Sequence, residues 1–266
     1  MLRKLLKYEF KATGRLIGVI YLAVLVAAIV TGIIGRFSDA TIDNPIAFMI
    51  FVAIYVILIV ALIVITVLMI IERFYKNMLT GEGYLMHTLP VPTWMHVASK
   101  TISAFVWEIV AIAVLILSLV LCFVSGGIWK EIFSVVYLDE MLEALAQYRG
   151  LILLTVVATF VQLIRIILMF YASMAIGGSS TRHKIALSVL AFILILIAIN
   201  IVSTLANVGL VGDFVFGIEV NGADSAITFN QYMKQALVHQ LIMDLVCSGV
   251  LFWLTNFFLK KKLNLE

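Results

Sequence analysis

Six long apolar runs are the feature that most limits what this chain can fold into. A helix needs roughly 20 mostly apolar residues to cross the hydrocarbon core of a bilayer, which is about 30 Å thick. Six runs reach this length, at about residues 16–34, 46–71, 101–124, 151–176, 185–205 and 241–259. Only 12% of the 266 residues are charged, whereas a soluble domain carries about a quarter. We therefore predict an all-α polytopic membrane protein, with six transmembrane helices in a single domain, 1–266.

The positions of the basic residues predict how these spans are oriented. Cytoplasmic connections carry an excess of lysine and arginine. Most of the 18 basic residues lie before the first run, between the second and third, between the fourth and fifth, or after the last. Most of the acidic residues lie in the other connections. Both termini are therefore expected in the cytoplasm, and the net charge of +3 is a topology signal with no indication of nucleic-acid binding.

Three segments outside the runs have helical patterns of their own. Residues 1–15 place apolar side chains on one helical face among lysines and arginines, which predicts a helix lying in the headgroup plane. A simple topology determinant explains the same residues equally well. Residues 125–150 predict a short amphipathic helix on the outer leaflet. Residues 206–240 begin Gly-rich and end in a helical pattern, and neither outer segment is large enough for a receptor domain.

We find no pattern that predicts catalysis or metal binding. His87 and His96 are too far apart for the i, i+4 spacing that places two imidazoles on one zinc ion, and we interpret them as loop histidines. Polar residues 179–183 are typical of a tight turn. Cys122 and Cys247 both lie inside apolar runs and predict no disulfide framework. The chain is therefore expected to be no enzyme, with no catalytic residue, metal or cofactor of its own.

Ionisable groups inside the predicted spans are more informative. Charged side chains deep in a membrane are costly and usually face protein or a water-filled cavity. Glu108 lies in the third span and Arg165 in the fourth, with Gln162 one helical turn from Arg165. We predict that Glu108 and Arg165 approach one another as an ion pair. A fixed pair that holds the helices together and a role in a transport path are both consistent with this pattern.

Three other polar residues in the spans carry weaker signals. Asp244 lies near the outer end of the sixth span and is expected to reach water. Asn200 and Asn256 are single amides, which usually make hydrogen bonds between helices. We assign no site to these residues.

The segment between the second and third spans, RFYKNMLTGEGYLMHTLPVPTWMHVASK, is too rich in helix breakers and polar residues for a simple turn. It resembles the first cytoplasmic loop of type-2 exporter permeases of ATP-binding-cassette (ABC) transporters, particularly those of Gram-positive bacteria. In that family a phrase like GEGYL, then TLP, then SK before the third span recurs. The expected architecture, with a basic N-terminal helix, six spans and both termini inside, is similar too.

The resemblance implies that residues 72–100 form a coupling loop that docks on a separate ATPase. The coupling segment would span Gly81 to Leu89, and Pro90 and Pro92 would end it. Glycines allow a tight turn, proline disfavours helix at the residue before it, and leucines at i and i+4 share a helical face. The residues expected to couple are Gly81, Glu82, Gly83, Tyr84, Leu85, Leu89 and Pro90.

The resemblance also implies partners, since the chain has no nucleotide-binding sequence. Two ATPase subunits would bind ATP and magnesium, and a second permease chain, identical or related, would complete a path through the bacterial cytoplasmic membrane. The expected function is export of an amphipathic or hydrophobic cargo, such as an antimicrobial peptide, a toxin or a drug. The movement would be alternating access.

Two other functions remain open. The chain could be a membrane sensor or immunity subunit that binds a peptide without translocating it. It could also be a proton-driven transporter that uses Glu108 and Arg165, although internal inverted repeats, common in such proteins, are not evident.

Overall fold

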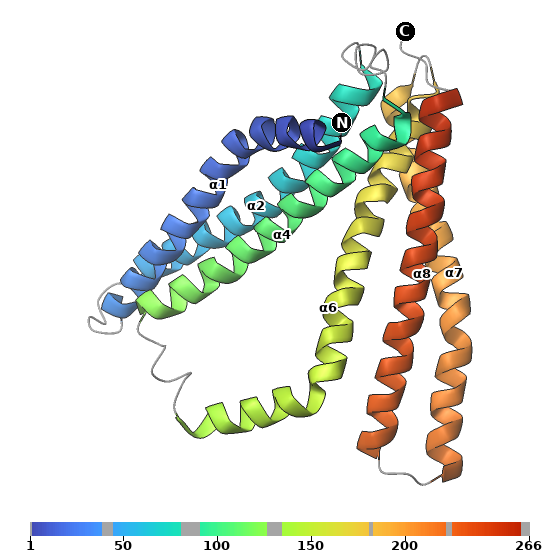
Figure 1. The fold of residues 1–266 in the computed structure, drawn as a ribbon. Helices are drawn as coiled ribbons and strands as arrows, with labels where there is room; N and C mark the ends of the chain where they lie inside the picture. Colours follow the sequence, from blue (N-terminus) through green and yellow to red (C-terminus); the bar gives the residue numbers. More distant parts are fainter. Residues whose placement is uncertain are drawn as a thin grey trace. The chain divides into compact units, whose positions relative to one another are not determined.

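The described part of the chain is helical and contains no strand. The computed structural model describes residues 2–38, 45–80, 91–126, 135–180, 183–221 and 225–261. Its helices are α1 (Leu2–Ser38), α2 (Pro45–Leu79), α4 (Thr93–Gly126), α6 (Val135–Gly177), α7 (Lys184–Asn221) and α8 (Ser225–Lys261) (Figure 1). The predicted all-α fold is confirmed.

Each of these helices contains a segment long and apolar enough to cross a membrane. The segments are Ile17–Arg36, Met49–Leu79, Thr93–Ser125, Leu145–Gly177, Lys184–Val208 and Gln231–Lys261. Many large apolar side chains on them are exposed, including Ile57 at 65% and Leu194 at 57%. An extensive apolar surface of this kind fits contact with lipid. The prediction of six spans in a multi-pass membrane protein is therefore confirmed.

Several segments that we predicted as separate elements are continuous with the spans. Residues 2–15 form the first turns of α1, and α6 begins at Val135 and runs into the fourth span. Helix α7 continues through the Gly-rich stretch to Asn221. A glycine costs only about 1 kcal/mol relative to alanine in a helix. The apolar, helix-compatible residues between these glycines therefore keep α7 intact.

The start of α4 changes the interpretation of one histidine. Helices α2 and α4 both extend into residues 72–100, which we assigned to the coupling loop. Pro92 directly precedes α4, and its carbonyl accepts a hydrogen bond from the Met95 N–H at 2.9 Å. Proline suits a helix start because its missing N–H would have no helical partner there. His96 is therefore a residue of α4, only 1% exposed, and its assignment to a loop was wrong.

The chain divides into two compact units. Unit 1 contains Met1–Glu72 and Ile102–Ala144, and unit 2 contains Arg73–Thr101 and Leu145–Glu266. The division falls inside α2, α4 and α6. The last turns of α2 and the first turns of α4 consequently belong to unit 2, although the rest of these two helices belongs to unit 1.

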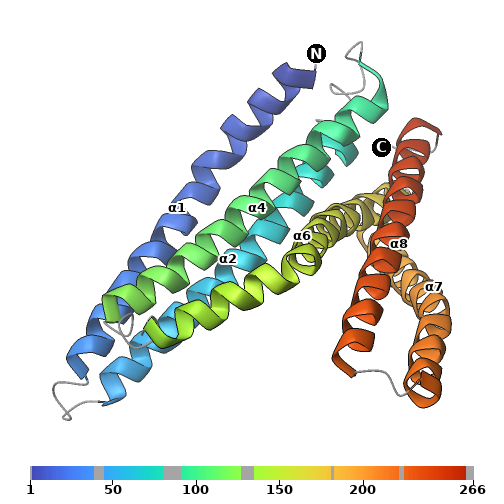
Figure 2. The same ribbon diagram turned by 60° about the horizontal axis from the view of Figure 1, so that its bottom comes forward.

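Unit 1 packs α1, α2 and α4 side by side (Figures 1 and 2). The Tyr21 hydroxyl of α1 lies 3.3 Å from the Thr66 hydroxyl of α2 and donates a hydrogen bond to the Trp107 carbonyl of α4, also at 3.3 Å. The Tyr55 and Ser118 hydroxyls join α2 and α4 at 2.9 Å. The core around these groups is apolar and includes Ile17, Val24, Ala28, Leu62 and Ala111. Uncharged hydroxyls therefore make the described polar contacts between the helices of unit 1.

Unit 2 packs α7 beside α8 (Figure 1), and its core contains Leu168 and Ala172 of α6 with Leu251 of α8. Gly177 ends α6 close to the start of α7. A methyl group at Gly177 would lie 1.9 Å from Ser188 Oγ and 2.6 Å from the Lys184 carbonyl oxygen. Glycine is needed here because larger residues would push the two helices apart.

Candidate functional site

An ion pair inside the membrane-spanning part of unit 2 joins α6 to α8. The Nε atom of Arg165 lies 2.7 Å from Oδ1 of Asp244, and the two side chains are 13% and 3% exposed. The Nε–H does not point along this line, so the contact is an ion pair without a well-formed hydrogen bond. Pairing lowers the high cost of placing either charge in a membrane.

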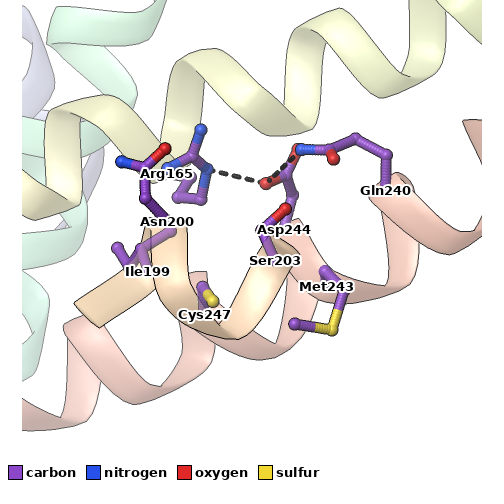
Figure 3. A pocket seen from close by; sticks show the side chains of 8 residues that line it. All are labelled: Arg165, Ile199, Asn200, Ser203, Gln240, Met243, Asp244 and Cys247. Carbon is purple, nitrogen blue, oxygen red and sulfur yellow. Dashed lines mark hydrogen bonds and ion pairs between the residues drawn. The ribbon is translucent and has the colours of Figure 1, made fainter. Parts of the chain in front are cut away.

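A second side chain of α8 holds the Asp244 carboxylate in place, independently of α6. Gln240, one turn earlier on α8, donates from Nε2 to both carboxylate oxygens, at 3.2 Å and 3.1 Å (Figure 3). Residues four apart share one face of a helix, so this contact follows from the sequence spacing once α8 forms. The amide fixes the carboxylate, and the carboxylate in turn positions the arginine.

A polar cavity of about 140 Å³ surrounds the pair between α6, α7 and α8. It has room for about five water molecules, at roughly 30 Å³ each. The cavity holds hydrogen-bond donors and acceptors, but its formal charges cancel. Such a lining suits water or a small neutral polar group. Its residues are Arg165, Ile199, Asn200, Ser203, Gln240, Met243, Asp244 and Cys247 (Figure 3).

The structure gives Arg165 a different carboxylate from the one we predicted. Asp244, which we expected to reach water, is 2% exposed and pairs with Arg165, so that expectation was wrong. Glu108 belongs to unit 1, and its approach to Arg165 stays a prediction. The error at Asp244 has a physical reason. Distance from a span end does not reveal which neighbouring helix covers a residue.

The three amides noted in the predicted spans, Gln162, Asn200 and Asn256, differ in their surroundings. Gln162 is exposed. Asn200 donates to the Leu196 carbonyl of its own helix at 2.8 Å, so its described hydrogen bond does not join two helices as expected. Asn256 has a buried Oδ1 without a hydrogen-bond partner among the described residues. The expectation of hydrogen bonds between helices therefore finds no support at these two asparagines.

Tyr171 of α6 connects the two helical segments that flank the predicted coupling loop. Its ring stacks on Phe74 of α2, with ring centroids 4.1 Å apart and an interplanar angle of 13°. Its hydroxyl donates a hydrogen bond to the Lys100 carbonyl of α4 at 3.4 Å. Phe74 is 0% and Tyr171 2% exposed. Both flanking segments are thus packed on one buried side chain of α6.

The predicted coupling residues themselves, Gly81 to Pro90, lie outside the described residues. The ends of the helices on either side are described, and they are buried. Met78 and Val97 are each 0% exposed, and Leu79 is 2% exposed. Hydropathy of single windows did not predict this burial, because the first turns of α4 mix polar and apolar residues.

Outside this region, the described residues show a turn after α6 and two cysteines without a disulfide. The Ser179 hydroxyl donates to the Ile176 carbonyl at 2.6 Å, so at this residue the polar segment 179–183 is a helix-ending turn, as predicted. No group of three or more potential metal ligands occurs within the ranges that the structure describes. Cys122 and Cys247 are free thiols.

Comparison of the chain with protein-family models, with curated proteins and with solved structures yields no match.

Proposed function

We propose that the chain is a permease subunit of an ABC exporter, driven by a separate ATPase that docks on residues 81–90. The observation that carries the proposal is the contact of Tyr171 with both helical segments that flank these residues. A loop that only joins two spans needs no such buried connection. A loop that transmits force needs rigid attachment at both ends.

The same contact suggests how force would spread. A displacement of the loop moves the end of α2 and the start of α4, which are packed on α6 in unit 2. Both helices continue into unit 1 without a break. Movement at the loop would therefore act on α6 directly, and it would reach unit 1 along the continuous helices α2 and α4. ATP hydrolysis itself belongs to the partner.

The proposal is tested by purifying the tagged full chain from its native membrane and identifying bound proteins. An ATPase is expected to copurify with the wild type. The double substitution Glu82→Ala and Tyr84→Ala is expected to reduce its recovery about tenfold, which corresponds to about 1.4 kcal/mol of binding free energy. Glu143→Ala is the matched control, because Glu143 is exposed and lies outside the candidate spans.

Two results would count against this function. Absence of an ATPase from the wild-type preparation removes the required partner. Equal recovery with the double variant and with Glu143→Ala excludes the coupling segment. Transport by proteoliposomes containing the copurified complex separates an exporter from a sensor, since a sensor binds cargo without moving it.

A further inference from the structure

The ion pair in unit 2 leaves one acidic residue near the middle of the described spans to be explained. Near the middle of the described spans lie three charged side chains, Glu108, Arg165 and Asp244. Arg165 and Asp244 pair with each other. Among the described residues of unit 1, Glu108 has neither an ion pair nor a hydrogen bond. An ionisable group at this depth usually serves a function, because its burial is costly.

Glu108 lines an otherwise apolar groove in unit 1. The groove has a volume of about 170 Å³ and lies between α2 and α4. Its apolar lining includes Leu62 and Ile63 of α2 and Ile112 and Leu115 of α4. Ile63 is 49% and Ile112 41% exposed, so the groove is open on the side of these two residues. A ligand dissolved in the membrane could enter from there.

The one hydroxyl in the groove is engaged elsewhere. Thr66 donates to the Leu62 carbonyl at 2.7 Å and contacts the Tyr21 hydroxyl at 3.3 Å. Its hydrogen bonds go to these groups, and a neutral hydroxyl could not balance the charge of a carboxylate in any case. The groove thus combines a single carboxyl group with mostly apolar walls.

We propose that this groove binds a monovalent lipophilic cation. The positive charge pairs with the Glu108 carboxylate, and an apolar arm contacts Leu62, Ile63 and Ile112. A cavity of about 150 Å³ holds benzene, so the groove accepts one aromatic ring or a short alkyl chain. A metal ion would need several ligands, an anion would be repelled, and a neutral ligand would leave the carboxylate without a counter-ion.

The site uses residues of this chain alone. In the proposed exporter, lipophilic cations that bind this site would be a class of cargo, and this role rests on the proposed function. Binding by the isolated chain does not depend on an ATPase. Failure to bind would therefore leave the exporter proposal standing, and loss of the ATPase partner would leave the binding site standing.

The test measures equilibrium binding of tetraphenylphosphonium to the purified full chain in detergent, with protein-free micelles as the blank. One of its phenyl groups matches the size of the groove. The wild type is expected to bind it, and tetraphenylborate, which has the same shape and the opposite charge, is expected not to compete. Glu108→Gln should weaken binding by about tenfold or more, as loss of roughly 1.4 kcal/mol or more requires.

Three further variants keep the result interpretable. Glu108→Asp retains the charge and should recover part of the affinity. Ile63→Trp retains the carboxylate but fills the groove, and it should also weaken binding. Glu143→Gln removes an exposed acid elsewhere and should bind as the wild type does. The proposal is overturned if the wild type does not bind, if Glu108→Gln binds equally well, or if tetraphenylborate competes equally.

Discussion

Units 1 and 2 accommodate polar groups inside the membrane in different ways. Unit 1 joins its helices through uncharged hydroxyls, such as Tyr55 to Ser118 at 2.9 Å. Unit 2 joins α6 to α8 through opposite charges, Arg165 and Asp244 at 2.7 Å. Removing one hydroxyl of such a pair should lower the free energy of unfolding only slightly, because hydrogen bonds between spans contribute only about 0.6 kcal/mol on average. Removing one charge of a buried ion pair should lower it much more. Substitutions in the two units should therefore have unequal effects on stability.

The largest effect is expected when the ion pair is broken on one side. Asp244→Leu leaves the Arg165 guanidinium buried without a counter-charge and should cost about 3–5 kcal/mol. The double variant Arg165→Met and Asp244→Leu should recover most of this loss, because an apolar pair of similar volume needs no counter-charge. Thermal unfolding of the purified chain in detergent measures both. A double variant as unstable as the single one would show that the charges do not act as a pair.

A smaller effect is expected at Tyr171, where unit 2 holds the ends of α2 and α4. Tyr171→Ala removes the stack on Phe74 and leaves a cavity, at a cost of about 3 kcal/mol. Tyr171→Phe removes only the hydrogen bond to the Lys100 carbonyl and should cost about 0.6 kcal/mol. Unfolding midpoints of the two variants separate the ring from its hydroxyl. Equal losses would mean that the stack contributes nothing.

The close approach of α6 and α7 predicts an effect of intermediate size. Gly177→Ala should cost about 1–3 kcal/mol, because the added methyl would overlap Ser188 and the backbone at Lys184. Gly249→Ala is the matched control within unit 2, since a methyl there meets nothing within 4 Å. It should be neutral or stabilising by up to about 1 kcal/mol. The same unfolding assay compares the two, and similar values would contradict the close packing.

The smallest effect is expected in unit 1. A double-mutant cycle of Tyr55→Phe and Ser118→Ala should give a coupling free energy of about 0.6 kcal/mol. The Ser118 hydroxyl keeps a second acceptor, the Leu115 carbonyl at 2.8 Å, and this limits the loss. A coupling free energy as large as that of the ion pair would remove the contrast between the units.

The overall fold could be predicted because membrane spans are encoded locally. An apolar run of sufficient length must form a helix in lipid, whatever its neighbours are. The contacts between spans are not encoded in this way. Arg165 was recognised as a costly charge, but its partner was not, because Asp244 becomes a neighbour only through the packing of α6 against α8. The role of Tyr171 likewise depends on packing between helices. Its residue type alone gave no signal, because tyrosines are common near span ends.

The Arg165–Asp244 pair has a consequence for how the chain is made. Asp244 is synthesised about 80 residues after Arg165, which takes several seconds at roughly 5–20 residues per second. Synthesis of α6 and α7 is completed within this time, while the carboxylate for Arg165 has not yet been made. Until α8 inserts, the Arg165 guanidinium lacks this counter-charge, and placing it in the bilayer core is costly. Insertion of the last helix is therefore the step that commits α6 to its place in the bilayer.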